Sequence, residues 1–330
     1  MHSTRNQLLR LLAPGEFMSG TVLGTQLSVS RTAVAKHIDG LKHLGLDIYS
    51  VKGKGYKLSA PLSLLSAISI SQYYQQLYKA SSGSQNEPLN LHVLNIIDST
   101  NTYIKTHLQS LDSGTACIAE AQTAGRGRHG RQWVSPFGSS IYLSMYWCFA
   151  GGYQTLSGLS LVVGLAVHAT LAQCGVDTAK LKWPNDVYVN MQKIAGILIE
   201  VEGSVGDSVH CVIGVGLNVN LPDGIGGIEQ PFTDLQSQLD EQMVDRNHLT
   251  AQLIHQLRQY MLQFEAHGLA PFIAQWQALN VFDQQEINVH FGQDIISGTC
   301  IGINEQGALL VDVAGQVKSF HGGEISVRAK

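Results

Sequence analysis

Apolar residues in the first part of the chain recur at the spacing of short helices. Val34, Ile38 and Leu41 follow the i, i+4, i+7 pattern of one buried helix face. Two shorter apolar helices precede this segment, and we expect Ser19 to cap the second of them. Residues 48–58 have the pattern of two strands joined by a Lys-Gly-Lys-Gly turn. Three helices followed by a hairpin predict a winged helix-turn-helix over residues 1–62.

The opposite face of the third helix is basic. Residues 1–60 carry a net charge of +5, whereas the remainder of the chain carries −9. A basic front on an acidic body favours nucleic-acid binding at one end. The alternative is a protein-docking module with a solvated basic face, but lysines at the hairpin tip favour DNA. The candidate DNA contacts are Arg31, Thr32, Lys36 and His37, on a helix that we expect Ser30 to cap, and Lys52 and Lys54 in the wing.

The composition is that of a folded protein with a large core. Of 330 residues, 44% are hydrophobic and 14% are charged, and the net charge is −4. This composition excludes a disordered chain. The five cysteines are widely spaced and include no C-x-x-C pair. Their spacing argues against a disulfide framework or a zinc module and favours a reducing compartment, so we expect a cytoplasmic protein.

One stretch has the apolar character of a membrane helix. Residues 156–176 contain no Asp, Glu, Lys or Arg and are long enough to span a bilayer. However, polar residues such as Ser160, His168 and Gln173 are spread along the stretch, and no basic cluster flanks it. We therefore predict a buried core helix and no membrane segment.

The remaining patterns predict an α+β protein. A helix over residues 66–79 and a polar loop over residues 81–88 form an expected linker, assigned to residues 63–90. Runs rich in valine and isoleucine predict the strands of a mixed sheet in a central domain, residues 91–278. Short strands separated by glycine turns predict a small SH3-like β-barrel over residues 279–330.

A run of short polar residues follows the first strand of the central domain. Asp98, Ser99, Thr100 and Asn101 come directly after the strand predicted over residues 91–97. Such side chains can cap a helix or hold a polar ligand. Capping alone is the simpler interpretation, and the residue types leave both open.

A second candidate site is the run GRGRHGR, Gly125–Arg131. A dinucleotide-binding turn would need a helix after the glycines and an acidic residue about 20 positions on. No acidic residue occurs between Glu120 and Asp177, and Trp133-Val134-Ser135-Pro136 cannot open a helix. The run also lacks the Gly-Lys-Ser/Thr of a Walker A loop. Three arginines among glycines in a chain poor in charge favour a phosphate-binding loop over a solvated one.

These motifs together resemble the biotin–protein ligase family. The resemblance is carried by GRGRHGRQWVSPFGSSIYLSM, DSTN, KWPND, KIAGILIE, GVGLNVN and GGEIS, and covers nearly the whole chain. With the winged helix in front, the chain is similar to the bifunctional bacterial ligases that also repress the biotin operon. The resemblance implies a central domain of the class II synthetase/biotin ligase type. It also implies formation of biotinyl-5′-AMP from biotin and ATP, with Mg²⁺ on the nucleotide, followed by transfer to a lysine of the biotin carboxyl carrier domain of acetyl-CoA carboxylase.

Site residues carry over from the family position by position. His129 departs mildly, since arginine is common there, and residues 224–230, near the expected adenine-covering loop, match nothing transferable. The resemblance also implies operator DNA as a partner and a homodimer in the adenylate-bound state, with the adenylate as corepressor. The implied biotin and adenylate contacts are Ser99, Thr100, Asn101, Gln122, Arg126, Gly127, Arg128, Trp183, Asn185, Asp186 and Lys193, among which Lys193 and Arg128 are the expected catalytic residues.

One alternative is a biotin-sensing regulator without ligation. Such a protein would need the pocket but not Lys193, so Lys193, Arg126 and Arg128 favour the enzyme. Lipoate ligases and class II aminoacyl-tRNA synthetases could share the core fold, but neither resemblance includes GRGRHG together with KWPND.

Overall fold

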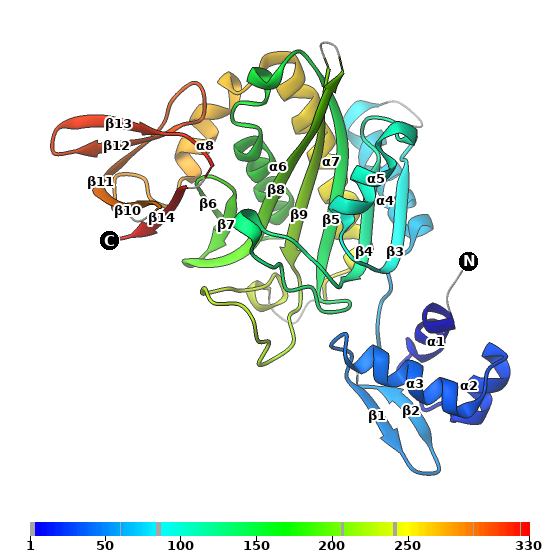
Figure 1. Cartoon of the computed structure of the whole chain (residues 1–330). Helices are drawn as coiled ribbons and strands as arrows, with labels where there is room; N and C mark the ends of the chain where they lie inside the picture. Colours follow the sequence, from blue (N-terminus) through cyan, green and yellow to red (C-terminus); the bar gives the residue numbers. More distant parts are fainter. Residues whose placement is uncertain are drawn as a thin grey trace.

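Three structural units follow one another along the chain (Figure 1). A computed structural model describes residues 4–59, 61–83, 87–205, 208–239, 243–292, 294–323 and 325–330. A small N-terminal unit is joined to a central sheet with helices, and a second sheet packs at the far end of the central one. The predicted α+β fold class is confirmed.

The N-terminal unit is a winged helix-turn-helix. Both predicted caps are present: the Ser19 hydroxyl accepts from Val22 N, and the Ser30 hydroxyl accepts from Ala33 N, each at 3.1 Å. These bonds fix the starts of the second and third helices. The elements are α1 (Thr4–Leu12), α2 (Gly20–Leu27), α3 (Arg31–Lys42) and the antiparallel strands β1 (Ile48–Val51) and β2 (Gly55–Leu58).

This unit packs against the central domain. Its apolar core includes Ala121 and Phe137, which belong to the central domain. Phe137 N donates to the Leu44 carbonyl at 3.2 Å, and Gly45 lies against Pro136. The segment that follows the glycine–arginine loop therefore contacts the N-terminal unit directly.

The linker is joined to the central domain by a hydrogen bond to a buried carboxylate. Helix α4 (Ala67–Ser82) begins after its cap Ser66 and runs three residues beyond the predicted end, so Ser81 and Ser82 are helical rather than in the expected loop. Residues 84–86 of that loop lie outside the described residues. Just before α4, Leu65 N donates to the buried carboxylate of Glu120 at 2.5 Å, and that carboxylate pairs with Arg246 at 2.6 Å.

A seven-stranded mixed sheet forms the central domain. The strand order is β3-β4-β5-β9-β8-β7-β6, with β3 and β4 parallel and the other pairs antiparallel. The long pairing between β5 and β9 lies in the middle of the sheet. The strands are β3 (Leu91–Ile97), β4 (Ala116–Gln122), β5 (Ser140–Ala150), β6 (Lys180–Lys182), β7 (Asp186–Val189), β8 (Gln192–Val205) and β9 (Ser208–Asn218).

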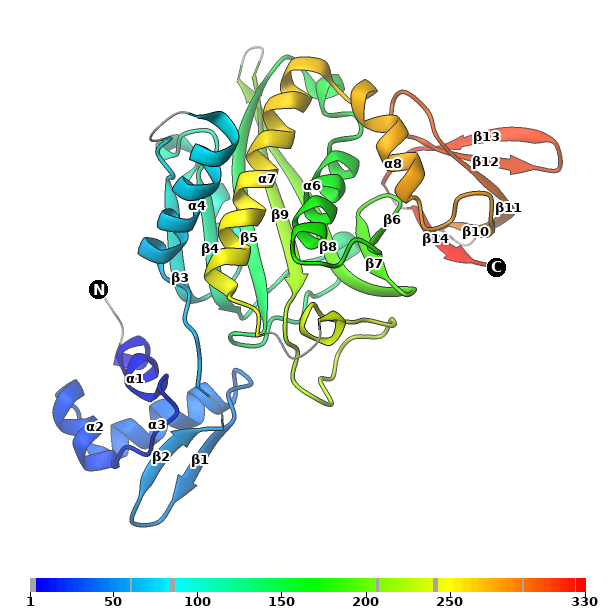
Figure 2. The ribbon, with the colours of Figure 1, turned by 180° about the vertical axis from the view of Figure 1, so that it is seen from behind.

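Helices cover the two faces of this sheet unequally. Figure 2 shows α4, α6 (Leu159–Gln173) and α7 (Arg246–His267) on one face, whereas α5 (Thr100–His107) lies on the other. The stretch Tyr153–Gln173 is long and apolar enough to cross a membrane. Ten of the 15 residues of α6 are nevertheless buried within the protein, as predicted for a core helix. The glycine–arginine loop lies over the face that carries α5.

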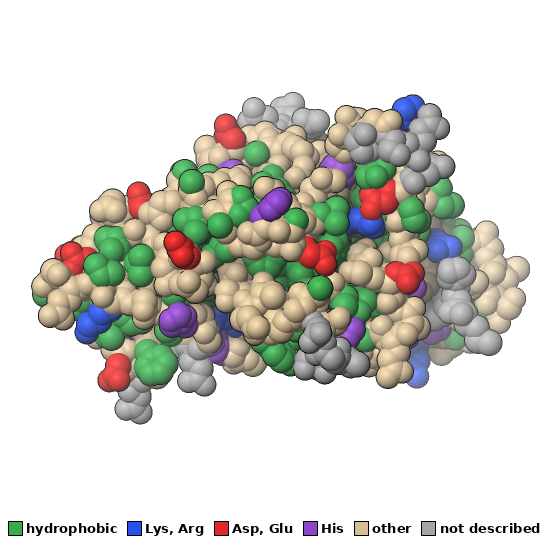
Figure 3. Space-filling view, turned by 90° about the horizontal axis from the view of Figure 1, so that it is seen from above, with side chains coloured by type: hydrophobic (Ala, Val, Ile, Leu, Met, Phe, Trp, Pro, Cys, Tyr) green, Lys and Arg blue, Asp and Glu red, His purple; other side chains and the backbone are tan. Residues whose placement is uncertain are grey.

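The C-terminal unit is a five-stranded antiparallel sheet. Its order is β13-β12-β11-β10-β14, and helix α8 (Ile273–Leu279) precedes it. Charged side chains are few and scattered on the face seen in Figure 3, in keeping with the low charge of the chain. The strands are β10 (Glu286–Phe291), β11 (Asp294–Ile303), β12 (Leu309–Val313), β13 (Gln316–Phe320) and β14 (Ile325–Ala329).

Candidate active site and DNA-binding face

The glycine–arginine loop crosses the open face of the central sheet (Figure 1). Gly127 N donates to the Arg131 carbonyl at 2.7 Å, which closes the loop on itself. Beneath the loop lies a cavity of about 430 Å³, lined by residues 126–131 together with Leu198 and Glu200 of β8 and Gly323. The loop thus forms one wall of the cavity, and strand β8 of the sheet forms the opposite wall.

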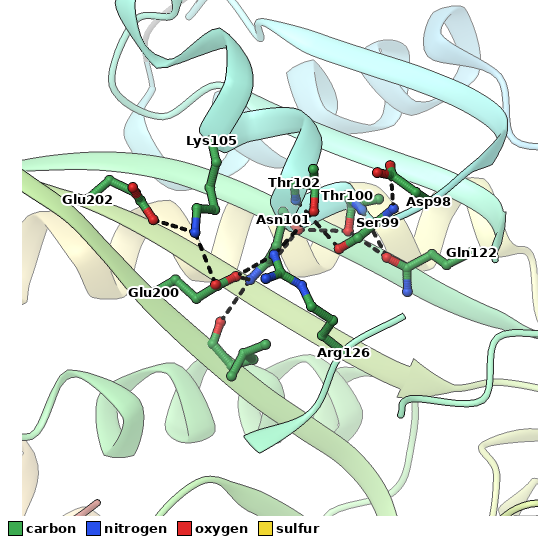
Figure 4. Close-up of polar contacts among 12 residues, drawn as sticks. Asp98, Ser99, Thr100, Asn101, Thr102, Lys105, Gln122, Arg126, Glu200 and Glu202 are labelled. Carbon is green, nitrogen blue, oxygen red and sulfur yellow. Dashed lines mark hydrogen bonds and ion pairs between the residues drawn. The ribbon is translucent and has the colours of Figure 1, made fainter. Parts of the chain in front are cut away.

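The polar run after β3 opens α5 beside this loop (Figure 4). Ser99 is the cap of α5, and Gln122 at the end of β4 accepts from Thr100 N at 2.9 Å. The Ser144 hydroxyl of β5 lies 2.7 Å from Thr100 Oγ1. The capping interpretation is therefore correct for Ser99, and Thr100 and Gln122 are fixed against each other.

Both polar atoms of the Asn101 side chain form hydrogen bonds within the protein. Its side-chain nitrogen donates to Glu200 at 2.8 Å and to the Leu198 carbonyl at 3.4 Å, while its oxygen lies 2.5 Å from the Ser144 hydroxyl. A side chain at Gly214 would meet that oxygen at 2.4 Å, so only glycine fits beneath it. Asn101 thus links α5 to β5 and β8, and it shapes the pocket through its neighbours.

Lys193 and Asp186 form an ion pair at the start of β8. Lys193 Nζ lies 2.7 Å from an Asp186 carboxylate oxygen and 5.4 Å from the centre of the Trp133 ring. The indole in turn lies on two glycines, since a Cβ at Gly196 or Gly216 would meet the ring at 2.8 or 2.5 Å. These glycines let an aromatic side chain from the loop reach the backbone of the sheet.

Arg128 connects the loop to two other elements. Its guanidinium donates to Asn185 Oδ1 at 2.9 Å and also to the Gly323 carbonyl of the C-terminal unit. Burial lowers the pKa of Arg128, and the nearby Asp186 carboxylate opposes that change. Glu324, the next residue of the GGEIS motif, lies outside the described residues. One side chain thus holds the loop, the KWPND turn and the C-terminal unit together.

The segment after β9 forms backbone hydrogen bonds with Lys193. Lys193 N donates to the Pro231 carbonyl, and Thr233 N donates to the Lys193 carbonyl, each at 3.0 Å. At its other end, Leu221 N donates to the Asp234 carboxylate at 2.9 Å. Residues 221–231 therefore form a closed loop beside the site, within which Gly227 lies against Val134.

The expected DNA contacts are accessible on the N-terminal unit. Arg31, Thr32 and Lys36 on α3 are exposed, and His37 is half-buried. Lys52 and Lys54 are exposed at the tip of the wing. The accessible residues of α3 and of the wing are of the types that make groove and backbone contacts.

Comparison with known proteins decides the family. A model described as the Biotin/lipoate A/B protein ligase family matches residues 93–218, an HTH domain model matches residues 4–57, and a Biotin protein ligase C terminal domain model matches residues 285–328. The chain is 42% identical to the bifunctional ligase/repressor BirA of Salmonella typhimurium, over 98% of this chain and 97% of the relative. The chain belongs to the bifunctional ligase/repressor family.

Another bifunctional relative and a solved ligase structure are also similar to this chain. The chain is 28% identical to the bifunctional ligase/repressor BirA of Bacillus subtilis over 99% of this chain and 100% of that one. Its fold is similar to that of a biotin protein ligase from Aquifex aeolicus in complex with biotin and ATP, with a TM-score of 0.64 and 28% identity, covering 73% of this chain and 99% of that one.

Trp183 of the KWPND motif lies in the main core of the ligase. It is buried with 3% of its surface exposed, and its indole N–H donates to the Gly307 carbonyl at 3.0 Å. The side chain thus joins the KWPND turn to the C-terminal unit. Asn185 and Asp186, two and three positions later, are the members of that turn that reach the site.

Three residues that contact this site are not among those predicted from the sequence. Glu200 accepts from Asn101 and pairs with Arg126, Trp133 lies under Lys193, and Ser144 holds Thr100 and Asn101. Glu200 lies within the quoted KIAGILIE run and Trp133 within the quoted loop motif. A carboxylate that ends an otherwise apolar strand pattern was the available signal for Glu200.

Proposed function

We propose that the protein is an ATP-dependent biotin–protein ligase that also represses the biotin operon. The observation that carries this proposal is the convergence of Arg128, from the glycine–arginine loop, with Asn185, Asp186 and Lys193, in a chain that begins with a winged helix. The acceptor is a lysine of the biotin carboxyl carrier domain of acetyl-CoA carboxylase. Ligases named for that substrate are among the relatives, including one from Mycobacterium tuberculosis that is 34% identical over 64% of this chain and 78% of its own.

In the first step a carboxylate oxygen of biotin bonds to the α-phosphorus of ATP, the bond to the bridging oxygen breaks, and pyrophosphate leaves. Both reactants are anionic, so catalysis is mostly positioning and supply of positive charge. Lys193 and Arg128 are the cations that we assign to the α-phosphate. Asp186 fixes the position of the Lys193 ammonium, and the Asn185 amide fixes the Arg128 guanidinium.

Biotin is assigned to the wall formed by α5 and the end of β4. Ser99, Thr100 and Gln122 supply short polar side chains there, and Arg126 of the loop donates to Thr102 of the same helix. Most ligand pockets combine apolar walls with a few fixed polar groups of this kind. Thr100 and Gln122 hold each other in place before a ligand arrives, which lowers the entropic cost of binding.

Mg²⁺ would enter with the nucleotide. The described residues hold no group of three or more His, Cys, Asp or Glu side chains arranged to bind a metal ion. Mg²⁺ commonly takes one or two carboxylates and several phosphate oxygens. Asp186, beside Lys193, is the carboxylate that fits such a site. The ion would supply additional positive charge to the triphosphate.

In the second step the neutral amine of the acceptor lysine attacks the biotinyl carbonyl. The carbon–oxygen bond to AMP breaks, AMP leaves with the electron pair, and the amine proton passes to solvent. Because the mixed anhydride reacts with water, the closed loop must protect it until the carrier arrives. Arg128 supports this role because it anchors the loop to two separate elements.

For repression, we assign residues 1–62 to the operator, with residues 63–90 as linker, 91–278 as catalytic domain and 279–330 as C-terminal domain. Biotinyl-5′-AMP is the proposed corepressor and acts by favouring a homodimer that places two recognition helices on the DNA. A cytoplasmic location is supported by the five free cysteines and by the burial of α6.

The test of ligation is incubation with ATP, Mg²⁺, biotin and a carboxyl carrier domain, followed by intact-mass measurement. We expect a gain of one biotinyl group on the carrier, and no gain without ATP or with a carrier whose acceptor lysine is replaced by arginine. A sensor without ligase activity would bind biotin yet leave the carrier mass unchanged, which would overturn the enzymatic part of the proposal.

A further inference from the structure

Glu200 is a carboxylate at the junction of three elements (Figure 4). It lies on β8, in the wall of the cavity beneath the loop, and 19% of its side chain is exposed. One of its oxygens accepts from Asn101 at 2.8 Å and pairs with Arg126 at 2.9 Å. The other oxygen lies 3.3 Å from Lys105 Nζ. A single side chain thus joins β8 to α5 and to the glycine–arginine loop.

The charges around Glu200 balance. Arg126 and Lys105 carry two positive charges, and Glu200 and Glu202 carry two negative ones, with Lys105 paired to both carboxylates. Arg126 also donates to Thr102 Oγ1 at 3.2 Å, so its guanidinium is held on α5 as well as on β8. The Arg126 guanidinium is thus held by contacts within the protein on two separate elements.

We propose that Glu200 is a positioning residue that closes the loop through Arg126 and orders the biotin wall through Asn101. The inference rests on the proposed ligase function and refines it: Arg126 anchors the loop, while Arg128 and Lys193 supply charge to the phosphate. Glutamine at position 200 could still accept from Asn101, but it would lose the ion pair to Arg126. Glu200→Gln therefore removes the ion pair with Arg126 and keeps the hydrogen bond to Asn101.

The first experiment compares Glu200→Gln with Glu202→Gln. Glu202 lies on the same strand and pairs with the same lysine, but among the described residues it makes no hydrogen bond or ion pair with Arg126 or Asn101. For Glu200→Gln we expect dissociation of biotinyl-5′-AMP to accelerate about 10-fold, since charge-assisted contacts of this kind are the strong ones. Subtilisin should also cut the loop faster in the presence of biotin and ATP. Glu202→Gln should resemble the wild-type protein in both measurements.

Kinetic parameters separate positioning from catalysis. Glu200→Gln should raise the KM for biotin about 10-fold and leave kcat for pyrophosphate release within about 3-fold, because the cations assigned to the phosphate are untouched. Arg126→Gln, at a side chain that is 40% exposed, should reproduce these changes without altering the thermal midpoint. In the double variant, Glu200→Gln should add little to Arg126→Gln, as expected for two partners in one interaction.

The results discriminate between this inference and the proposed function. If the wild-type protein forms no adenylate, the proposed function fails. If it forms adenylate but Glu200→Gln and Arg126→Gln hold it as the wild-type protein does, the inference about Glu200 is wrong while the ligase function stands. Additive effects in the double variant, or an equal effect of Glu202→Gln, would also overturn it.

Discussion

Lys193 and Asp186 form an ion pair of 2.7 Å with only 13% and 15% of their side chains exposed. Lys193 is the second residue of β8 and Asp186 is the first residue of β7, and the two strands are antiparallel neighbours. The Lys193 ammonium also lies 5.4 Å from the centre of the Trp133 ring. These contacts fix the position of the ammonium at the strand end where we place the α-phosphate.

Replacement of Lys193 by alanine should affect chemistry far more than folding. Loss of a positioned charge in a site that excludes water costs on the order of 3 kcal/mol, so adenylate formation should fall about 100-fold or more. Lys193 lies at a strand end and outside the apolar core, so the effect on folding is limited to the loss of its pair with Asp186. The measurements are pyrophosphate release and the thermal midpoint, and near-normal release by a folded Lys193→Ala variant would remove Lys193 from the mechanism.

Replacement of Arg128 by glycine should loosen the hold on the adenylate. The variant loses the contacts to Asn185 and to the Gly323 carbonyl, so the loop is no longer anchored to the KWPND turn and the C-terminal unit. We expect biotinyl-5′-AMP to escape and to label lysines of bystander proteins. Arg131→Gly is the matched control, since Arg131 lies in the same loop and its side chain is exposed. Labelling confined to the cognate carrier would contradict the prediction.

The sequence predicted local features well because they depend on near neighbours. Ser19 and Ser30 cap the helices that they were expected to cap, and α6 is the buried helix expected from its apolar pattern. Motif positions also located the site, since Arg128, Asn185 and Lys193 converge there. In each case a spacing of a few residues, or a dense motif, contained the information.

Long-range pairs could not be predicted in the same way. Glu120 and Arg246 are 126 positions apart, and Glu200 lies 74 positions from Arg126. No periodicity relates such residues, because their contact depends on how the sheet and helices pack. The position of Trp183 is a similar case, since its hydrogen bond to Gly307 exists only once the C-terminal unit has docked.

The buried Glu120–Arg246 pair should be important for stability. Glu120 is fully buried, and 7% of the Arg246 side chain is exposed. Glu120→Gln leaves a buried arginine unpaired, so the free energy of unfolding should fall by about 3 kcal/mol or more, as for other broken buried pairs. Denaturant unfolding measures this change. The exposed Lys330–Glu286 pair provides the control, and an equally small effect of Glu120→Gln and Glu286→Gln would refute the prediction.

Two histidines should make stability depend on pH. Burial is the main cause that lowers the pKa of His168 on α6 and of His255 on α7 below the usual 6.5. As the pH falls through 6.5, the unfolded chain therefore takes up protons that the folded protein resists, and stability decreases. We expect the thermal midpoint to fall between about pH 7 and pH 5, and the His168→Gln/His255→Gln variant to show a smaller fall. An equal fall in both proteins would exclude these histidines as the cause.

Adenylate should couple the catalytic domain to the DNA-binding unit. One winged helix with a net charge of +5 in its first 60 residues should bind DNA weakly at physiological salt, because counterions compete for the phosphates. A dimer supplies two recognition helices for a two-fold operator. Ordering of the Gly125–Arg131 loop by adenylate would lower the entropic cost of packing that loop at a subunit contact.

The coupling must be reciprocal, so operator DNA should tighten adenylate binding by the same factor by which adenylate tightens operator binding. Scarce acceptor would let adenylate accumulate and close the operon, whereas abundant acceptor would consume it and open the operon. Sedimentation and operator binding, each with and without biotinyl-5′-AMP, test the prediction, with a chain lacking residues 1–62 as control. If adenylate changes neither the mass in solution nor the operator affinity, or if the truncated chain still binds DNA, the repressor part of the proposal is wrong and only the ligase remains.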